Sequence, residues 1–191
     1  MSESFFILAA GAVPTEYPTW EEAAWYLLGI IFFLLLNAFF VASEFAIVKV
    51  RPSQIEGEME SKPRRAGISR HVVRELDGYL SANQLGITIA SLALAFLGEP
   101  FIAKLVGPLL DKTTGWPAGV IKGITLFIAM CSFTFLHVVI GELLPKSIAI
   151  RKSLATTMVI ARPLHIFYSI FRPFIFILNG TANFLLKKVF K

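Results

Sequence analysis

Charged side chains are scarce in this chain of 191 residues, and basic ones are missing from its whole N-terminal part, where Lys49 is the first Lys or Arg. Only 16% of the residues are charged, whereas about a quarter are charged in an ordinary soluble domain. Hydrophobic residues make up 55% of the chain, and the mean hydropathy is +0.69. This composition excludes an ordinary soluble domain and predicts a membrane protein.

Several motifs of enzymes and metal proteins are also missing. The single cysteine, Cys131, excludes a disulfide within one chain and a thiolate metal site. The sequence has no HExxH motif, no glycine-rich phosphate loop and no evident Ser/His/Asp or Ser/Lys constellation. We therefore expect that the protein is not an enzyme, and a membrane-embedded hydrolase using Glu44 or Glu142 is the least favoured hypothesis.

The first 24 residues are predicted to be a short extracytoplasmic arm. The stretch FFILAAGA resembles the apolar region of a signal peptide, but no basic segment precedes it. Cleavage of this arm is the less favoured alternative.

Three stretches are long enough to cross a bilayer, which takes about 20 residues: residues 25–48, 79–97 and 120–144. Basic residues are concentrated in residues 49–74 and again after Pro145. The positive-inside rule then places the N-terminus outside and the C-terminus in the cytoplasm. Residues 25–145 are thus predicted to form a three-span core in the cell (plasma) membrane. The net charge of +5 reflects this topology, so we expect no nucleic-acid partner.

Residues 146–191 are predicted to form basic and amphipathic juxtamembrane helices on the cytoplasmic side. Residues 163–186 are apolar enough for a fourth span, but they contain Arg172, Pro173, Asn179 and Asn183. We favour two helices that lie in the interface against lipid and are hinged at Pro173. A fourth span is the alternative.

Small and polar residues follow two patterns in the second span. Ala82, Gly86 and Ala90 recur every four residues, which is typical of helices that approach closely. Polar residues recur on a helical face, namely Ser81, Gln84, Thr88 and Ser91. Helix packing explains both patterns. Gly86 also thins the helix, so that an ion could reach backbone oxygens.

An acid and a helix breaker end the third span, in the segment GELLPKSIAI. Pro145 has no N–H, so the carbonyl of Gly141 loses its usual helical donor. The carboxylate of Glu142 lies beside that carbonyl, and one cation could satisfy both oxygens. A proline kink, with Glu142 bonded to a neighbouring helix, is the alternative.

The candidate ligands in the three spans are all oxygens: the side chains of Ser43, Asn83, Ser91 and Glu142 and the carbonyl of Gly141. Oxygen ligands with a carboxylate suit hard cations such as Mg²⁺, Ca²⁺ or Na⁺ rather than Zn²⁺ or Cu⁺. Composition does not choose among the hard cations.

Three segments together resemble the transmembrane domain of the CorC/cyclin M family of magnesium transporters: NAFFVASEFAIVKVR, LSANQLGITIASLALAFLGEP and GELLPKSIAI. The resemblance covers residues 25 to 160. It implies an all-α integral membrane protein that forms a homodimer, with three transmembrane helices per subunit, juxtamembrane helices and broken helices around a central ion. It also implies Mg²⁺ efflux coupled to Na⁺, and regulatory CBS domains after this region, outside these 191 residues.

The same resemblance implies a metal site assembled from the three segments. Its members would be Ser43, Asn83, Gly86, Ser91, Gly141 and Glu142, with Thr88 as the alternative to Ser91. The leading hypothesis is a Mg²⁺ transporter. The alternative is a non-transporting Mg²⁺ sensor or dimeric scaffold in which the ion is structural.

Overall fold

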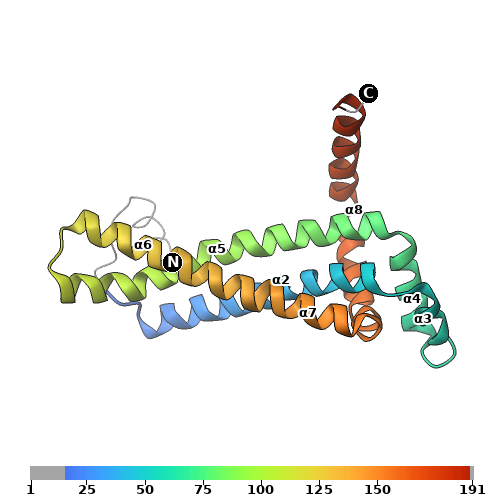
Figure 1. Cartoon of the computed structure of the whole chain (residues 1–191), viewed down its shortest axis with the longest axis horizontal. Helices are drawn as coiled ribbons and strands as arrows, with labels where there is room; N and C mark the ends of the chain where they lie inside the picture. Colours follow the sequence, from blue (N-terminus) through green and yellow to red (C-terminus); the bar gives the residue numbers. More distant parts are fainter. Residues whose placement is uncertain (1–15, 190–191) are drawn as a thin grey trace. The chain divides into compact units, whose positions relative to one another are not determined.

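The computed structural model describes residues 16–189, and every element of regular structure in that range is a helix. Figure 1 follows their order along the chain: α2 (Trp20–Lys49), α3 (Pro52–Gly57), α4 (Pro63–Arg74), α5 (Leu76–Thr114), α6 (Ala118–Leu136), the π-helix η1 (His137–Leu143), α7 (Leu144–Arg151) and α8 (Ser153–Val189). The predicted all-α membrane fold is confirmed. The predicted arm of residues 1–24 lies largely outside the described residues.

Four helical stretches are long and apolar enough to cross a membrane, whereas the sequence predicted three spans. The additional one is α8, a helix of 37 residues that continues through Pro163 and Pro173. The predicted pair of helices hinged at Pro173 is therefore wrong. Proline removes one helical hydrogen bond, but the residues on both sides keep theirs, and apolar helices tolerate such a loss.

Regular structure also extends beyond the predicted spans. The second span is extended in α5, a helix of 39 residues that contains Pro100 and Pro108 and runs well past residue 97. The basic segment of residues 49–74 holds α3 and α4, and each of these helices has a proline in its first turn. Proline favours that position because the first N–H groups of a helix have no intrahelical acceptor.

The chain divides into two compact units. Unit 1 consists of Met1–Leu35 and Ala90–Gly141, and unit 2 of Leu36–Ile89 and Glu142–Lys191. In unit 1, an ion pair joins α2 to α5, because the buried Lys104 ammonium lies 3.2 Å from the Glu22 carboxylate. The same ammonium lies 5.5 Å from the ring centroid of Tyr26, and the ring of Phe133 packs against Gly98.

The larger apolar cluster in the core of unit 2 draws on four helices. Its buried members are Phe40, Ile47, Val72, Tyr79, Ile160, Ala161 and Leu164. α4 packs on α3 and on α8, and α7 packs on α8. A buried Ser69 hydroxyl lies 3.5 Å from the carbonyl of Thr157, so it ties α4 to α8. The connection between α2 and α5 is therefore a packed part of this unit.

Large apolar side chains remain exposed along the long helices. Examples are Leu28 and Phe32 on α2, Phe96 on α5, Phe127 on α6 and Phe176 on α8. Soluble monomers rarely expose so much contiguous apolar surface. These side chains suit contact with lipid tails.

We predict that Tyr79→Phe lowers the unfolding temperature of the protein in detergent. Tyr79 is fully buried, and its hydroxyl lies 2.5 Å from Nδ1 of His165 on α8. The substitution leaves that nitrogen without this partner, which costs about 1–3 kcal/mol in a buried site. The exposed Tyr17 provides the control variant, Tyr17→Phe. Equal unfolding temperatures for Tyr79→Phe and the wild type would contradict the assigned bond.

Candidate cation site

Ser43 lies on the buried face of α2 and has no exposed surface. Its hydroxyl donates a hydrogen bond of 2.7 Å to the carbonyl of Phe39, one turn earlier. A serine hydroxyl has one hydrogen and two acceptor lone pairs. Because the hydrogen is used within the helix, only acceptor capacity is left, and that capacity suits a cation.

Asn83 on α5 is a buried amide with unmet bonding capacity. It is 0% exposed, and among the described residues neither its Oδ1 nor its Nδ2 has a hydrogen-bond partner. A buried polar group left without a partner costs about 1–3 kcal/mol. Native structures contain few such groups, and each requires an explanation. A bound ion that takes Oδ1 as a ligand is one such explanation.

A close contact between α2 and α5 sets the positions of these two side chains. A Cβ atom placed on Gly86 would lie 2.5 Å from the ring of Phe40, so only glycine fits there. Further along α2, Ile47 shares the core cluster of unit 2 with Tyr79, which precedes Gly86 on α5. The two helices run in opposite directions in this part of unit 2 (Figure 1). Ser43 lies between Phe40 and Ile47 along α2, and Asn83 lies between Tyr79 and Gly86 along α5.

Glu142 lies at the junction between a π-helix and an α-helix. The π-helix η1 covers His137–Leu143, and Pro145 follows in the first turn of α7. The sequence predicted that Pro145 removes the hydrogen bond to the carbonyl of Gly141, but it did not predict that the disturbance takes the form of a π-helix. Such segments are rare, and they are frequent at functional sites. Gly141 is buried within the π-helix, and Glu142 is half-buried.

A cation–π contact ties the segment after Glu142 to α2. The ammonium of Lys146 lies 4.3 Å from the ring centroid of Phe45, and Phe45 follows Ser43 by two residues. Lys146 also follows Glu142 by four residues, so the two side chains share a helical face. Ser43, Asn83 and Glu142 all belong to unit 2, and the segment after Glu142 contacts α2 there.

Each of the remaining predicted ligands either belongs to unit 1 or is exposed. Ser91 and Gly141 lie in unit 1, so their roles as ligands stay predictions. Thr88, the alternative to Ser91, is exposed, and its hydroxyl bonds to the carbonyl of Gln84 in the same helix. This geometry does not favour Thr88.

The two patterns predicted for the second span differ in outcome. Ala82, Gly86 and Ala90 are all buried, so the small-residue face is confirmed. The predicted polar face does not form one buried surface, because Gln84 and Thr88 are exposed. Ser81 instead donates to Oδ1 of Asn179 on α8, at 2.8 Å. No pattern in the sequence predicted that partner.

The charge available to the site is small. Within residues 16–189, no group of three or more His, Cys, Asp or Glu side chains could hold a metal ion. The candidate donors are therefore two neutral side-chain oxygens and one carboxylate. Such a set suits a hard cation that binds without strong charge neutralisation.

This arrangement defines the class of the protein: a helical membrane domain with buried polar side chains on its long apolar helices. The model of the family described as "Cyclin M transmembrane N-terminal domain" matches residues 28–190. The chain belongs to this family.

Curated relatives support the same assignment. The chain is 48% identical to the UPF0053 protein YhdT and 47% identical to the UPF0053 protein YugS, both from Bacillus subtilis; each match covers more than four-fifths of this chain, at 83% and 84%. It is 33% identical to the uncharacterized protein MT1889 of Mycobacterium tuberculosis over 80% of this chain. These alignments cover 34%, 37% and 43% of the relatives, so the chain spans well under half of their length.

We predict that Gly86→Ala destabilises unit 2, because the new methyl group would collide with the ring of Phe40. Overpacking of this kind costs about 1–3 kcal/mol. Phe40→Leu in the same chain should recover part of the loss, since a smaller side chain leaves room for the methyl group. Thermal unfolding in detergent measures both effects.

Gly123 on α6 provides the control for this prediction, because a Cβ atom there would meet nothing within 4 Å. Gly123→Ala should leave the unfolding temperature unchanged or slightly higher. If Gly86→Ala and Gly123→Ala behave alike, the close contact does not constrain the helices.

Proposed function

We propose that this domain transports Mg²⁺ across the membrane, by efflux in exchange for Na⁺. Membership of the cyclin M family supports a membrane protein of this kind. The observation that supports the choice of a cation is the buried amide of Asn83, which has no hydrogen-bond partner among the described residues. An ion bound by Oδ1 of Asn83 would satisfy the carbonyl half of that amide.

In this proposal each ligand has a distinct role. The carboxylate of Glu142 supplies negative charge, and the hydroxyl of Ser43 and the amide of Asn83 supply neutral oxygens. Mg²⁺ requires oxygen ligands in nearly octahedral geometry at about 2.0–2.1 Å. Water would complete the shell.

The low charge of this ligand set favours an ion that is transported over an ion that stays tightly bound. One carboxylate neutralises half of the charge of a divalent ion, so the bound state is not deeply stabilised. Lys146, one turn after Glu142 and held over Phe45, adds positive charge nearby. An ion that must leave as well as enter needs binding of this limited strength.

The wider assembly is also part of the proposal. Four apolar helical stretches support a multi-pass membrane protein. The distribution of Lys and Arg supports an N-terminus outside the cell membrane and a C-terminus in the cytoplasm, which requires that the first three stretches cross the membrane and that α8 lies on the cytoplasmic side. Since the chain spans about a third of the curated relative YhdT, the homodimer, the Na⁺ coupling, the regulatory CBS domains and the absence of enzymatic activity are proposals for the full-length protein.

A structural ion is the second candidate function. The proposed ligands lie next to the contact between Phe40 and Gly86, so a bound ion could act only by holding α2 against α5. A protein of this kind would be a Mg²⁺ sensor or a dimeric scaffold. Binding measurements alone do not separate the two functions, because both require the same site.

We predict that Asn83→Leu has opposite effects without and with Mg²⁺. In Mg²⁺-free buffer the variant should unfold at a higher temperature than the wild type, because the unmet buried amide has been replaced by an apolar group of similar size. The increase in unfolding temperature on adding Mg²⁺ should be lost. A variant that keeps this Mg²⁺ response would show that Asn83 is not a ligand.

We predict that Glu142→Gln abolishes Mg²⁺ movement across the membrane of sealed liposomes that contain a Mg²⁺-sensitive dye. The substitution removes the negative charge of the site and keeps the size of the side chain. Glu99→Gln, at a half-buried glutamate of unit 1, should transport like the wild type. Wild-type liposomes in which Mg²⁺ never moves, with or without a Na⁺ gradient, would support the structural-ion function instead.

A further inference from the structure

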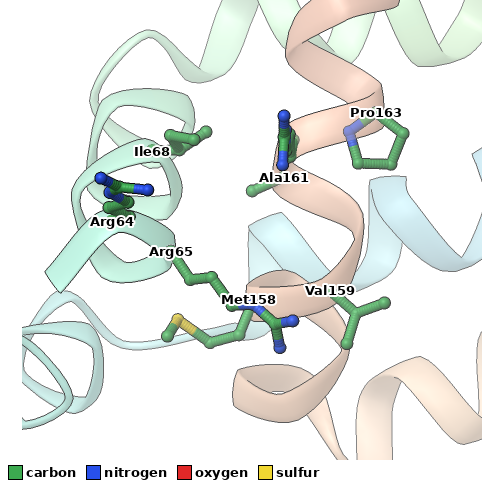
Figure 2. Close-up of a pocket in the computed structure, with 8 residues that line it drawn as sticks. Arg64, Arg65, Ile68, Met158, Val159, Ala161 and Pro163 are labelled. Carbon is green, nitrogen blue, oxygen red and sulfur yellow. The ribbon is translucent and has the colours of Figure 1, made fainter. Parts of the chain in front are cut away.

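A cavity of about 650 Å³ lies between α4 and α8, within unit 2. Figure 2 shows that Arg64, Arg65 and Ile68 project from α4, and that Met158, Val159, Ala161 and Pro163 project from α8, around the same space. Arg162 completes the lining. None of these residues belongs to the candidate cation site.

The cavity carries positive charge that no acid of the described residues neutralises. Arg64, Arg65 and Arg162 are exposed, and none of them forms an ion pair with an Asp or Glu in the range 16–189. The adjacent Lys62, by contrast, lies 2.9 Å from the carboxylate of Glu58. Three guanidinium groups from two helices, arranged around one hollow, suit a phosphate group, because each can donate two parallel hydrogen bonds.

The position of two of these arginines is unfavourable for the helix itself. Arg64 and Arg65 lie in the first turn of α4, which contains no acidic residue. The N-terminus of a helix carries partial positive charge, so basic side chains there repel it. A bound anion would relieve both the repulsion within α4 and the repulsion among the three arginines.

The floor of the cavity is apolar. Met158 and Ala161 are buried, Ile68 is half-buried, and Val159 is exposed beside them. A free phosphate ion has no apolar part that could contact this surface. A molecule that joins a phosphate to hydrocarbon could use both parts of the lining, with its phosphate on the guanidinium groups and its hydrocarbon on α8.

The place of the cavity in the chain points to the same ligand. α4 lies in the connection between α2 and α5, both of which are long enough to span a membrane. The cavity therefore lies at one end of these helices, at the level of lipid head groups. The basic residues of this connection place it on the cytoplasmic side, where anionic lipids attract Lys and Arg.

We propose that the cavity between α4 and α8 binds the phosphate group of an anionic phospholipid through Arg64, Arg65 and Arg162. The bound lipid holds α4 against α8 and so stabilises the core of unit 2, which includes Val72 of α4 and Ala161 of α8. This binding is independent of the proposed ion transport, because the cavity shares no residue with the cation site.

The test uses this chain in detergent with added dioleoyl-phosphatidylglycerol or dioleoyl-phosphatidylcholine, with bound lipid counted by native mass spectrometry. Phosphatidylglycerol should bind to the wild type, and phosphatidylcholine should bind much more weakly. The combined variant Arg64→Gln, Arg65→Gln and Arg162→Gln should bind phosphatidylglycerol at least about tenfold more weakly, since it loses several charge-assisted hydrogen bonds.

A matched control removes the same charge at exposed positions that do not line the cavity: Arg151→Gln, Lys187→Gln and Lys188→Gln. This variant should bind phosphatidylglycerol like the wild type. Equal losses in both variants would show that net charge alone attracts the lipid, and would overturn the proposal. Unchanged binding in the cavity variant would overturn it as well.

A third arm distinguishes a lipid from a soluble phosphate. Inorganic phosphate or glycerol phosphate at millimolar concentration should not displace phosphatidylglycerol, because neither can occupy the apolar floor. Full displacement would assign the cavity to a soluble phosphate compound and overturn the lipid. If the combined variant fails to fold, Arg162→Gln alone serves in all three arms, with Arg151→Gln as its control.

Discussion

The close contact between the ring of Phe40 and the backbone at Gly86 is the constraint on which the rest of the candidate site depends. It brings α2 and α5 together at a point where no side chain larger than hydrogen fits. Ser43 and Asn83 each lie three residues along the chain from this contact. Phe40 also belongs to the core cluster that includes residues of α4 and α8.

The buried amide of Asn83 lowers the stability of the folded protein, because it has no hydrogen-bond partner among the described residues. An apolar residue would pack better at this place. A buried polar group that lowers the stability of the fold is typical of a binding site whose ligand is absent. The π-helix that carries Gly141 and Glu142 is a second departure from ordinary helical structure. Both departures occur in the segments that supply the predicted ligands, which connects the local irregularities to one function.

Much of this structure could be predicted from local pattern. The apolar runs predicted helices, and the spacing of Ala82, Gly86 and Ala90 predicted a buried small-residue face, as the structure shows. Pro145 predicted a disturbance, but its form as a π-helix depends on how the neighbouring turns pack. The partner of Gly86, the bond from Ser81 to Asn179 and the cavity between α4 and α8 join residues far apart in sequence. Helical periodicity carries no information about such pairs. Two helices were predicted in place of α8 because proline breaks a helical hydrogen bond. The intact turns on either side of the proline, which stabilise the helix, were not considered.

The central claim is that a hard cation binds where Ser43, Asn83 and the Glu142 segment come together. A crystal of the protein grown with Mn²⁺ in place of Mg²⁺ tests it most directly, because Mn²⁺ also prefers oxygen ligands and its anomalous scattering locates it without reference to the protein atoms. The account predicts one strong peak within bonding distance of Oδ1 of Asn83 and the carboxylate of Glu142. A map with no peak there, or with its peak elsewhere in the protein, would contradict the account.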